Sequence, residues 1–284
     1  MNRSVETVLP GLRTLEGGGF WVRRPFPTQI VDHLDPFLLL DQMGPTDVAP
    51  GEAKGAPDHP HRGFETVTYV LSGEMEHKDS AGNAGSLGPG DVQWMTAGDG
   101  VVHSEMPSRK FQTAGGRLLG FQLWVNLPRA DKRMRPRYQE LKSAQIPSAR
   151  SADGKVVVKV IAGESHGARA AVDTRTPIFY LHFSLQPGAR VVQRAPREYS
   201  AFAWVFSGEA RFGDRVVQEG RAAVFGGDGD EIEIAADTPA ELLLIGGVPL
   251  REPVARYGPF VMNSEAELME AFQDYQAGRM GQIG

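Results

Sequence analysis

The sequence of 284 residues contains no cysteine. This excludes disulfides, thiolate metal ligands, cysteine nucleophiles and iron–sulfur clusters, and it fits a reducing compartment. No apolar run approaches the roughly 18 residues of a membrane-spanning helix, and residues 1–20 lack the apolar segment of a signal peptide. We therefore expect a cytoplasmic protein with no membrane partner, or a nuclear one if the cell is eukaryotic.

Basic residues are fewer than acidic ones. Lysine and arginine number 30 against 35 aspartates and glutamates, which gives a formal net charge of −5. A protein that binds nucleic acid through phosphates normally needs a basic face, because each phosphate carries a negative charge. The composition therefore argues against direct binding to DNA or RNA.

Long helical patterns are rare, whereas short apolar runs recur along the chain. The strand-like runs are residues 66–71, 118–125, 156–161, 178–185, 201–206 and 242–245. Glycine (34 residues) and proline (20 residues) separate them, as is typical of β-sandwiches and β-barrels. An all-β fold follows, with one clear exception near the end of the chain. There, a polar start at residues 263–267 followed by spaced apolar residues predicts an amphipathic helix over about 263–277.

The chain shows an internal duplication. The segment Tyr69-Val-Leu-Ser-Gly-Glu74 is repeated as Trp204-Val-Phe-Ser-Gly-Glu209, at an offset of 135 residues, with valine, serine, glycine and glutamate in register. A Gly-bearing turn and a further strand follow each copy. We therefore predict an N-terminal domain over residues 1–135, a linker over 136–155 that is rich in charge and proline, and a similar C-terminal domain over 156–284.

Two histidine-containing pairs are the most informative feature of the first copy. His59 and His61 are two residues apart, and so are His103 and Glu105. Side chains two apart on a strand point to the same face, so two such pairs on neighbouring strands can converge on one ion. Three imidazoles and one carboxylate suit one divalent transition metal, Fe, Mn, Ni, Co, Cu or Zn, with a position left open for water or substrate.

The duplication supplies a control for this interpretation. At the offset of 135, Arg194 stands opposite His59 and Pro196 opposite His61. If the histidines were needed for the fold, the second copy would be expected to keep them. Their absence there favours a functional metal in the N-terminal domain alone.

Glu65 has an open role at this stage. It lies four residues after His61 and shares its face unless Gly63 bulges the strand. It could be a fifth ligand, a carboxylate that orients a ligand histidine, or a base that faces the open metal position, and we favour the second and third roles. The remaining histidines, at positions 33, 77, 166 and 182, have no spaced partner, so we expect them to be structural or superficial.

Three motifs closely resemble the pirin family of the cupin superfamily. They are Asp58-His-Pro-His-Arg-Gly-Phe-Glu65, Gly90-Asp-Val-Gln-Trp-Met-Thr-Ala-Gly98 and His103-Ser-Glu-Met-Pro107. The resemblance extends over essentially the whole chain. It implies two tandem cupin jelly-roll barrels with one metal, usually iron, in the N-terminal barrel. By the same resemblance, His59, His61, His103 and Glu105 would be its ligands, which departs from the general cupin pattern in placing the ligand carboxylate after the last histidine.

The resemblance implies two different functions. Some pirin-like proteins are similar to quercetin 2,3-dioxygenases, which open a flavonol ring with O₂ and release carbon monoxide. This implies a small aromatic, flavonol-like substrate, with Glu105 or Glu65 taking the proton of its 3-hydroxyl. Other members resemble regulators that bind a protein partner according to the redox state of the metal. We expect the dioxygenase activity first, the regulator second, and a purely structural metal last.

Overall fold

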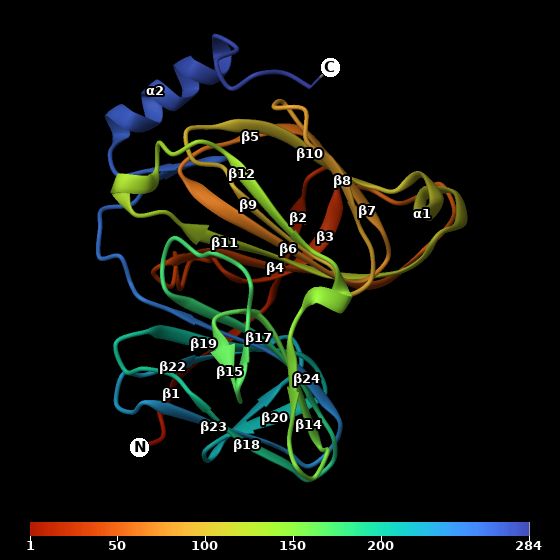
Figure 1. Ribbon diagram of the computed structural model, residues 1–284, viewed down its shortest axis with the longest axis vertical. Coiled ribbons are helices and arrows are strands. Elements are labelled where there is room, and N and C mark those ends of the chain that lie inside the picture. The colour runs from red at the N-terminus through yellow and green to blue at the C-terminus, as the bar shows by residue number, and fades with distance from the viewer. Residues whose placement is uncertain (284) are drawn as a thin grey trace. The chain divides into compact units, whose positions relative to one another are not determined.

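A computed structural model describes residues 1–283 of the chain, which divides into two compact units (Figure 1). We call one unit the first barrel; it comprises Arg13–Arg24, Phe37–Ser143 and the chain from Arg251 onward. The other unit, the second barrel, comprises Met1–Leu12, Pro25–Pro36 and Ala144–Leu250. Each unit is built mainly from one seven-stranded and one four-stranded antiparallel sheet.

The first barrel contains both α-helices. Its seven-stranded sheet has the order β12 (Arg137–Leu141), β9 (Val92–Thr96), β6 (Phe64–Ser72), β11 (Gly116–Asn126), β4 (Phe37–Val48), β3 (Phe20–Phe26), β2 (Leu12–Glu16). Its four-stranded sheet has the order β5 (Ala56–His61), β10 (Val101–Pro107), β7 (Met75–Asp79), β8 (Ala84–Leu87). A short sheet of β25 (Ala255–Tyr257) and β26 (Phe260–Met262) is followed by α2 (Glu265–Gln276), and α1 (Arg109–Ala114) follows β10.

The second barrel repeats this plan. Its seven-stranded sheet has the order β1 (Val5–Pro10), β22 (Arg221–Phe225), β19 (Ser200–Ser207), β24 (Ala240–Gly247), β17 (Ile178–Leu185), β14 (Val156–Ala162), β13 (Ser148–Arg150). Its four-stranded sheet has the order β18 (Ala189–Arg194), β23 (Glu231–Ala236), β20 (Glu209–Phe212), β21 (Arg215–Gln218), and β15 (Glu164–Ser165) and β16 (Ala168–Arg169) form a small hairpin. The core alternates along each strand, as Phe179, Leu181 and Phe183 of β17 show.

The all-β architecture, the two barrels and the C-terminal helix are therefore confirmed. The duplication is visible in the sheet orders: β9, β6, β11 and β4 occupy the same successive places in one sheet as β22, β19, β24 and β17 in the other. Likewise, β5, β10, β7 and β8 correspond to β18, β23, β20 and β21. Strand β18 therefore stands in the second barrel where β5, with its two histidines, stands in the first.

The ends of the chain depart from the expected boundaries of 1–135 and 156–284. The first residues belong to the second barrel, where β1 pairs with β22 and the guanidinium of Arg3 donates to the carbonyl of Tyr199 at 2.8 Å. Helix α2 belongs to the first barrel, where Leu268 and Ala271 pack in one cluster with Val102 of β10. Such pairings join residues more than 150 positions apart, so no local sequence pattern announces them.

Smaller elements also differ from expectation. The interval 136–155 is not a free linker, since β12 pairs with β9 of the first barrel and β13 with β14 of the second. Helix α1 has only six residues and begins at Ser108, whose hydroxyl accepts the backbone N–H of Phe111. Helix α2 begins as predicted, with Ser264 accepting from the N–H of Glu267. None of the helices in residues 1–283 is long and apolar enough to cross a membrane.

Candidate metal centre

Two neighbouring antiparallel strands carry the three histidines of the sequence motif. Strand β10 pairs with β5 so that His103 lies directly opposite His59, while Val101 lies opposite His61. His59 and His61 are two residues apart on β5, so their side chains leave the strand on the same face. The sequence therefore brings the three imidazoles together through strand spacing and register, as the two pairs predicted.

The three imidazoles form one tight cluster. Each offers a ring nitrogen, and these donor atoms all lie within 4.8 Å of one another. The Nε2 atoms of His59 and His61 are 3.0 Å apart, and the ring centroids of His59 and His103 are 4.4 Å apart. Metal–nitrogen bonds are about 2.0–2.1 Å long, so two of them span at most about 4.2 Å. The three imidazoles are therefore close enough to share one ion after small adjustments of their rings.

One backbone contact defines the tautomer of His59. Its Nδ1 lies 2.7 Å from the carbonyl oxygen of Pro57, which can only accept a hydrogen bond. Nδ1 must therefore carry a hydrogen, which leaves Nε2 as the nitrogen that can bind a metal. A metal-binding histidine is commonly oriented in this way by an acceptor on its other nitrogen.

Burial makes the other two histidines good neutral ligands. His61 is buried and His103 has no exposed surface, and burial lowers the pKa of each well below the ordinary value, with His59 adding to the effect. Among the described residues, both ring nitrogens of His103 have no hydrogen-bond partner. A buried polar atom without a partner is costly, and a cation bound between uncharged imidazoles removes that cost. The three histidines could therefore hold a metal ion.

Glu105 lies beside this cluster but is not part of it in the structure. It follows His103 by two residues on β10, after an irregularity in the pairing with β5. Its Oε1 accepts a hydrogen bond of 2.8 Å from the hydroxyl of Thr68, and its Oε2 lies 3.5 Å from the amide nitrogen of Gln122. These two contacts hold the carboxylate within the first barrel. Its predicted role as a fourth ligand remains a prediction.

Glu65 is held elsewhere. Strand β5 ends at His61, and the chain passes through Gly63, at φ +88°, into β6 of the other sheet. Glu65 is buried there opposite Thr96 of β9, whose hydroxyl donates to its Oε1 at 2.6 Å. His61 and Glu65 therefore do not share one unbroken strand, which was the condition for placing them on one face.

Aromatic side chains border the cluster. The ring of His61 meets Phe64 at 5.0 Å and Trp124 at 5.2 Å, both edge to face. The guanidinium of Arg256 lies over the Trp124 ring at 5.1 Å and also donates to the carbonyl of Leu38. Trp124 lies in the strand-like run 118–125 of the sequence. Its position gives the site an apolar wall with a cation on one side of the indole.

Two buried cations support the strand connection after His61, and sequence reasoning assigned neither of them this role. Arg62 is buried and forms an ion pair with Asp274 of α2, with Nη1 and Oδ2 2.7 Å apart. Lys132 is also buried, and its ammonium donates to the carbonyls of Gly63 and Val261 and to the amide oxygen of Asn126 at 2.7–2.9 Å. The family motif contains Arg62 but gives no sign of its partner, which lies 212 residues away.

Comparison with known proteins agrees with this architecture. The Pirin family matches residues 19–125, and the Pirin C-terminal cupin domain matches residues 180–281. A pirin-like protein of Solanum lycopersicum is 46% identical over 270 residues, covering 94% of this chain and 89% of its own length. Pirin of Rattus norvegicus is 44% identical over 273 residues, covering 94% and 89%.

A solved structure is also similar over the full length. The crystal structure of a quercetin 2,3-dioxygenase from Acinetobacter baumannii has a TM-score of 0.95 and 36% sequence identity, and the match covers 100% of both chains. The family matches, the two barrels and the histidine cluster in the first of them lead to one conclusion. This chain is a member of the pirin family.

Proposed function

We propose that the first barrel is a metal-dependent dioxygenase site of the quercetin 2,3-dioxygenase type, with iron as the metal. His59, His61 and His103 would hold the ion, and a flavonol would be cleaved by O₂ with release of carbon monoxide. The observation that carries this proposal is the convergence of three imidazoles, among which His103 is buried with no hydrogen-bond partner on either ring nitrogen among the described residues. The likeness to the Acinetobacter baumannii quercetin 2,3-dioxygenase supports the choice of reaction.

The bound metal would supply a Lewis acid that lowers the pKa of the flavonol 3-hydroxyl and a centre through which electron density reaches O₂. Three protein ligands leave positions open for the 3-hydroxyl and 4-carbonyl oxygens. Phe64 and Trp124 flank His61 and would limit the access of water beside it. Exclusion of water protects a reactive, electron-rich substrate from side reactions.

Glu105 is the carboxylate that we propose as the acceptor of the 3-hydroxyl proton. It is on the same strand as His103 and two residues away from it, so it leaves β10 on the same face. The hydroxyl of Thr68 donates to Oε1, which orients the carboxylate. A positioned carboxylate base of this kind commonly contributes about 10²–10⁴ in rate. Oε2 is the oxygen with the weaker contact and is the one we assign to the proton or to the metal.

Glu65 is proposed as a positioning residue. Its hydrogen bond with Thr96 joins β6 to β9, and both strands belong to the sheet that carries Phe64. A carboxylate held by a 2.6 Å bond in a buried position is poorly placed to move toward a substrate. It would therefore act through the wall of the site and not on the flavonol itself.

The test is oxygen uptake and loss of the flavonol absorption band by protein loaded separately with Fe²⁺, Mn²⁺, Co²⁺ or Ni²⁺. Turnover by a loaded protein, with carbon monoxide released in proportion to O₂ consumed, is expected. A His103→Ala variant prepared in the same way should lack it. If no loaded protein turns over flavonols although the site is filled, the dioxygenase proposal fails. The search would then turn to protein partners that respond to the redox state of the metal.

A further inference from the structure

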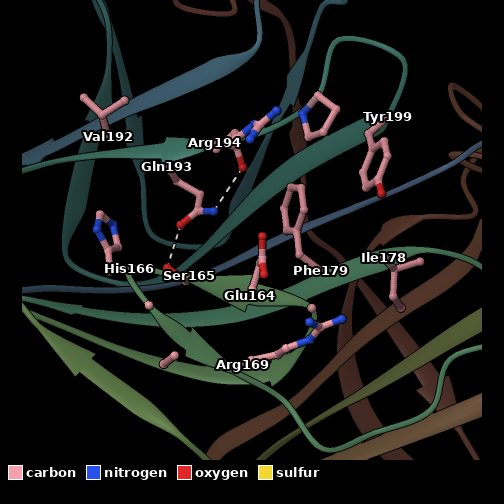
Figure 2. A pocket seen from close by; sticks show the side chains of 14 residues that line it. Glu164, Ser165, His166, Arg169, Ile178, Phe179, Val192, Gln193, Arg194 and Tyr199 are labelled. Carbon is pink, nitrogen blue, oxygen red and sulfur yellow. Dashed lines mark hydrogen bonds between the residues drawn. The ribbon is translucent and has the colours of Figure 1, made fainter.

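The second barrel contains a large pocket that the metal site does not use. Its volume is about 670 Å³, within the range of small-molecule sites. The pocket is lined from β17, β18 and the β15–β16 hairpin, and by the segment after β18, which includes Pro196 and Tyr199. Figure 2 shows these side chains.

Two lining residues are the ones that the sequence duplication aligns with histidines of the first barrel. At the offset of 135, Arg194 at the end of β18 stands opposite His59, and Pro196 stands opposite His61. Both residues line the pocket. The second copy therefore has no histidine at these positions, and an arginine and a proline border a pocket instead.

The charges in the pocket favour an organic anion. Arg169 and Arg194 bring two guanidinium groups to the lining, and Glu164 brings one carboxylate. Glu164 and Arg169 lie opposite each other on the two strands of the hairpin. Arginine recognises a carboxylate with two parallel hydrogen bonds, while a carboxylate such as Glu164 accepts from a hydroxyl. The lining thus suits a ligand with one carboxylate and a separate hydrogen-bond donor.

The apolar part of the lining favours an aromatic ring. Phe179 and Tyr199 have nearly parallel rings, with centroids 6.1 Å apart and an interplanar angle of 14°. Both line the pocket (Figure 2). Phe179 is buried in the core of the barrel, so the half-buried ring of Tyr199 is the one that offers a planar ligand a contact surface.

Buried polar groups keep the pocket wall in place. Gln193 is buried, and its amide accepts from the hydroxyl of Ser165 at 2.6 Å and donates to the carbonyl of Arg194 at 3.0 Å (Figure 2). The bond from Ser165 connects the hairpin to β18, and the bond to Arg194 fixes the orientation of the Gln193 amide within β18. The pocket is therefore formed before any ligand arrives, which lowers the cost of binding.

We propose that the second barrel binds a hydroxylated aromatic carboxylate without a metal. The carboxylate would contact Arg169 and Arg194, the hydroxyl would face Glu164, and the ring would lie against Tyr199. This proposal concerns the second barrel alone and does not depend on the chemistry of the first.

The experiment is calorimetric titration of the full chain, stripped of metal, with 4-hydroxybenzoate. Saturable binding to one site is expected. Benzoate, which lacks the hydroxyl, and 4-hydroxybenzamide, which lacks the charge, should bind more weakly. Arg169→Gln and Arg194→Gln should each weaken 4-hydroxybenzoate binding about tenfold or more, the usual effect of losing a charge-assisted hydrogen bond. Both arginines are exposed, so the variants should keep the melting temperature of the parent.

Two controls separate this pocket from other sites. Arg190→Gln removes an exposed arginine of the same strand that does not line the pocket, and it should leave binding unchanged. His59→Ala removes a histidine of the first barrel and should also leave it unchanged. No saturable binding up to about 10 mM would overturn the proposal. Equal binding by the parent and both pocket variants, or loss of binding in His59→Ala, would overturn it as well.

Discussion

Arg62, the residue next to His61, forms an ion pair with Asp274 of helix α2, with Nη1 and Oδ2 2.7 Å apart. Both side chains are largely buried, and contact with Arg62 and Arg279 holds the pKa of Asp274 below its ordinary value. Residues 212 positions apart in the sequence therefore meet next to the end of β5, the strand of His59 and His61. The helix is part of the support of the site.

Asp274→Asn should destabilise the protein. Removing the charge of Asp274 leaves the buried guanidinium of Arg62 without its ion-pair partner. We therefore expect the free energy of unfolding to fall by about 1–3 kcal/mol. Glu270→Gln is the matched control, because it removes a carboxylate of the same helix that pairs with the half-exposed Arg133. Its loss should change stability by less than about 1 kcal/mol. Urea unfolding of the metal-free variants measures both, and equal losses would contradict the role given to Arg62.

Gly63→Ala should lower the stability of the protein by more than the cost of placing alanine at a positive φ. A Cβ at this position would lie 1.9 Å from the carbonyl oxygen of Val261. Gly82 has the same φ of +88°, but a Cβ there would meet nothing within 4 Å, so Gly82→Ala isolates the cost of the backbone conformation. We expect about 1–2 kcal/mol for Gly82→Ala and several kcal/mol for Gly63→Ala in thermal unfolding. Similar losses would mean that the approach of Val261 does not constrain the connection.

Substitution of the two candidate glutamates, Glu105 and Glu65, should affect flavonol turnover to different extents. Glu105→Gln keeps the size of the side chain but removes its basicity, so we expect kcat to fall by about 10²-fold or more while bound metal is retained by the three histidines. Glu65→Gln should lower kcat by less than about tenfold, because Glu65 acts through Thr96 and the sheet. Metal content and flavonol turnover are measured on the same preparations. The assignment would be reversed if Glu65→Gln alone abolished turnover.

Lys132 should make the free energy of unfolding depend on pH between about pH 7 and about pH 10. Burial lowers its pKa from 10.5 to about 7, although Glu252 and Glu267 raise it. Between these values the unfolded chain binds a proton that the folded protein does not, so stability rises with pH, by up to about 1.4 kcal/mol per unit. Below about pH 7 both states are protonated, and this dependence ends.

Lys132→Met tests that dependence. The variant lacks the titrating group, so its free energy of unfolding should rise less steeply than that of the parent between about pH 7 and about pH 10. Urea unfolding at several pH values gives the two slopes. The variant also loses the hydrogen bonds of the Lys132 side chain to Gly63, Asn126 and Val261, so we expect it to be less stable than the parent, and the comparison rests on the slopes. Identical slopes would show that Lys132 stays charged in the folded protein over this range.

Local patterns were sufficient to predict the strands, the duplication and the histidine cluster. Strand spacing fixes the face of a side chain, so His59, His61 and His103 could be brought together once β5 and β10 were paired. Glu65 could not be placed in this way. Its position depends on the break at Gly63, which in turn depends on the carbonyl of Val261 nearly 200 residues later.

Local patterns also could not predict which barrel each end of the chain packs on. The capping residues of α2 predicted a helix at Ser264 but not the barrel it packs on, which depends on contacts such as that of Leu268 with Val102. The pocket of the second barrel is lined by residues between Gly163 and Tyr199, but several separate elements must be packed together to form it. Its arginines are indistinguishable from ordinary surface charges until β18 and the β15–β16 hairpin are placed together.

The central claim is that His59, His61 and His103 hold one metal ion at which a flavonol is cleaved. Anomalous diffraction at the metal edge, from crystals loaded with Fe²⁺ and soaked with a flavonol without O₂, tests it most directly. We predict one peak bonded to the three histidines, with the flavonol 3-hydroxyl and 4-carbonyl oxygens beside it. A peak elsewhere in the protein, or a filled site from which the flavonol is absent, would contradict the claim.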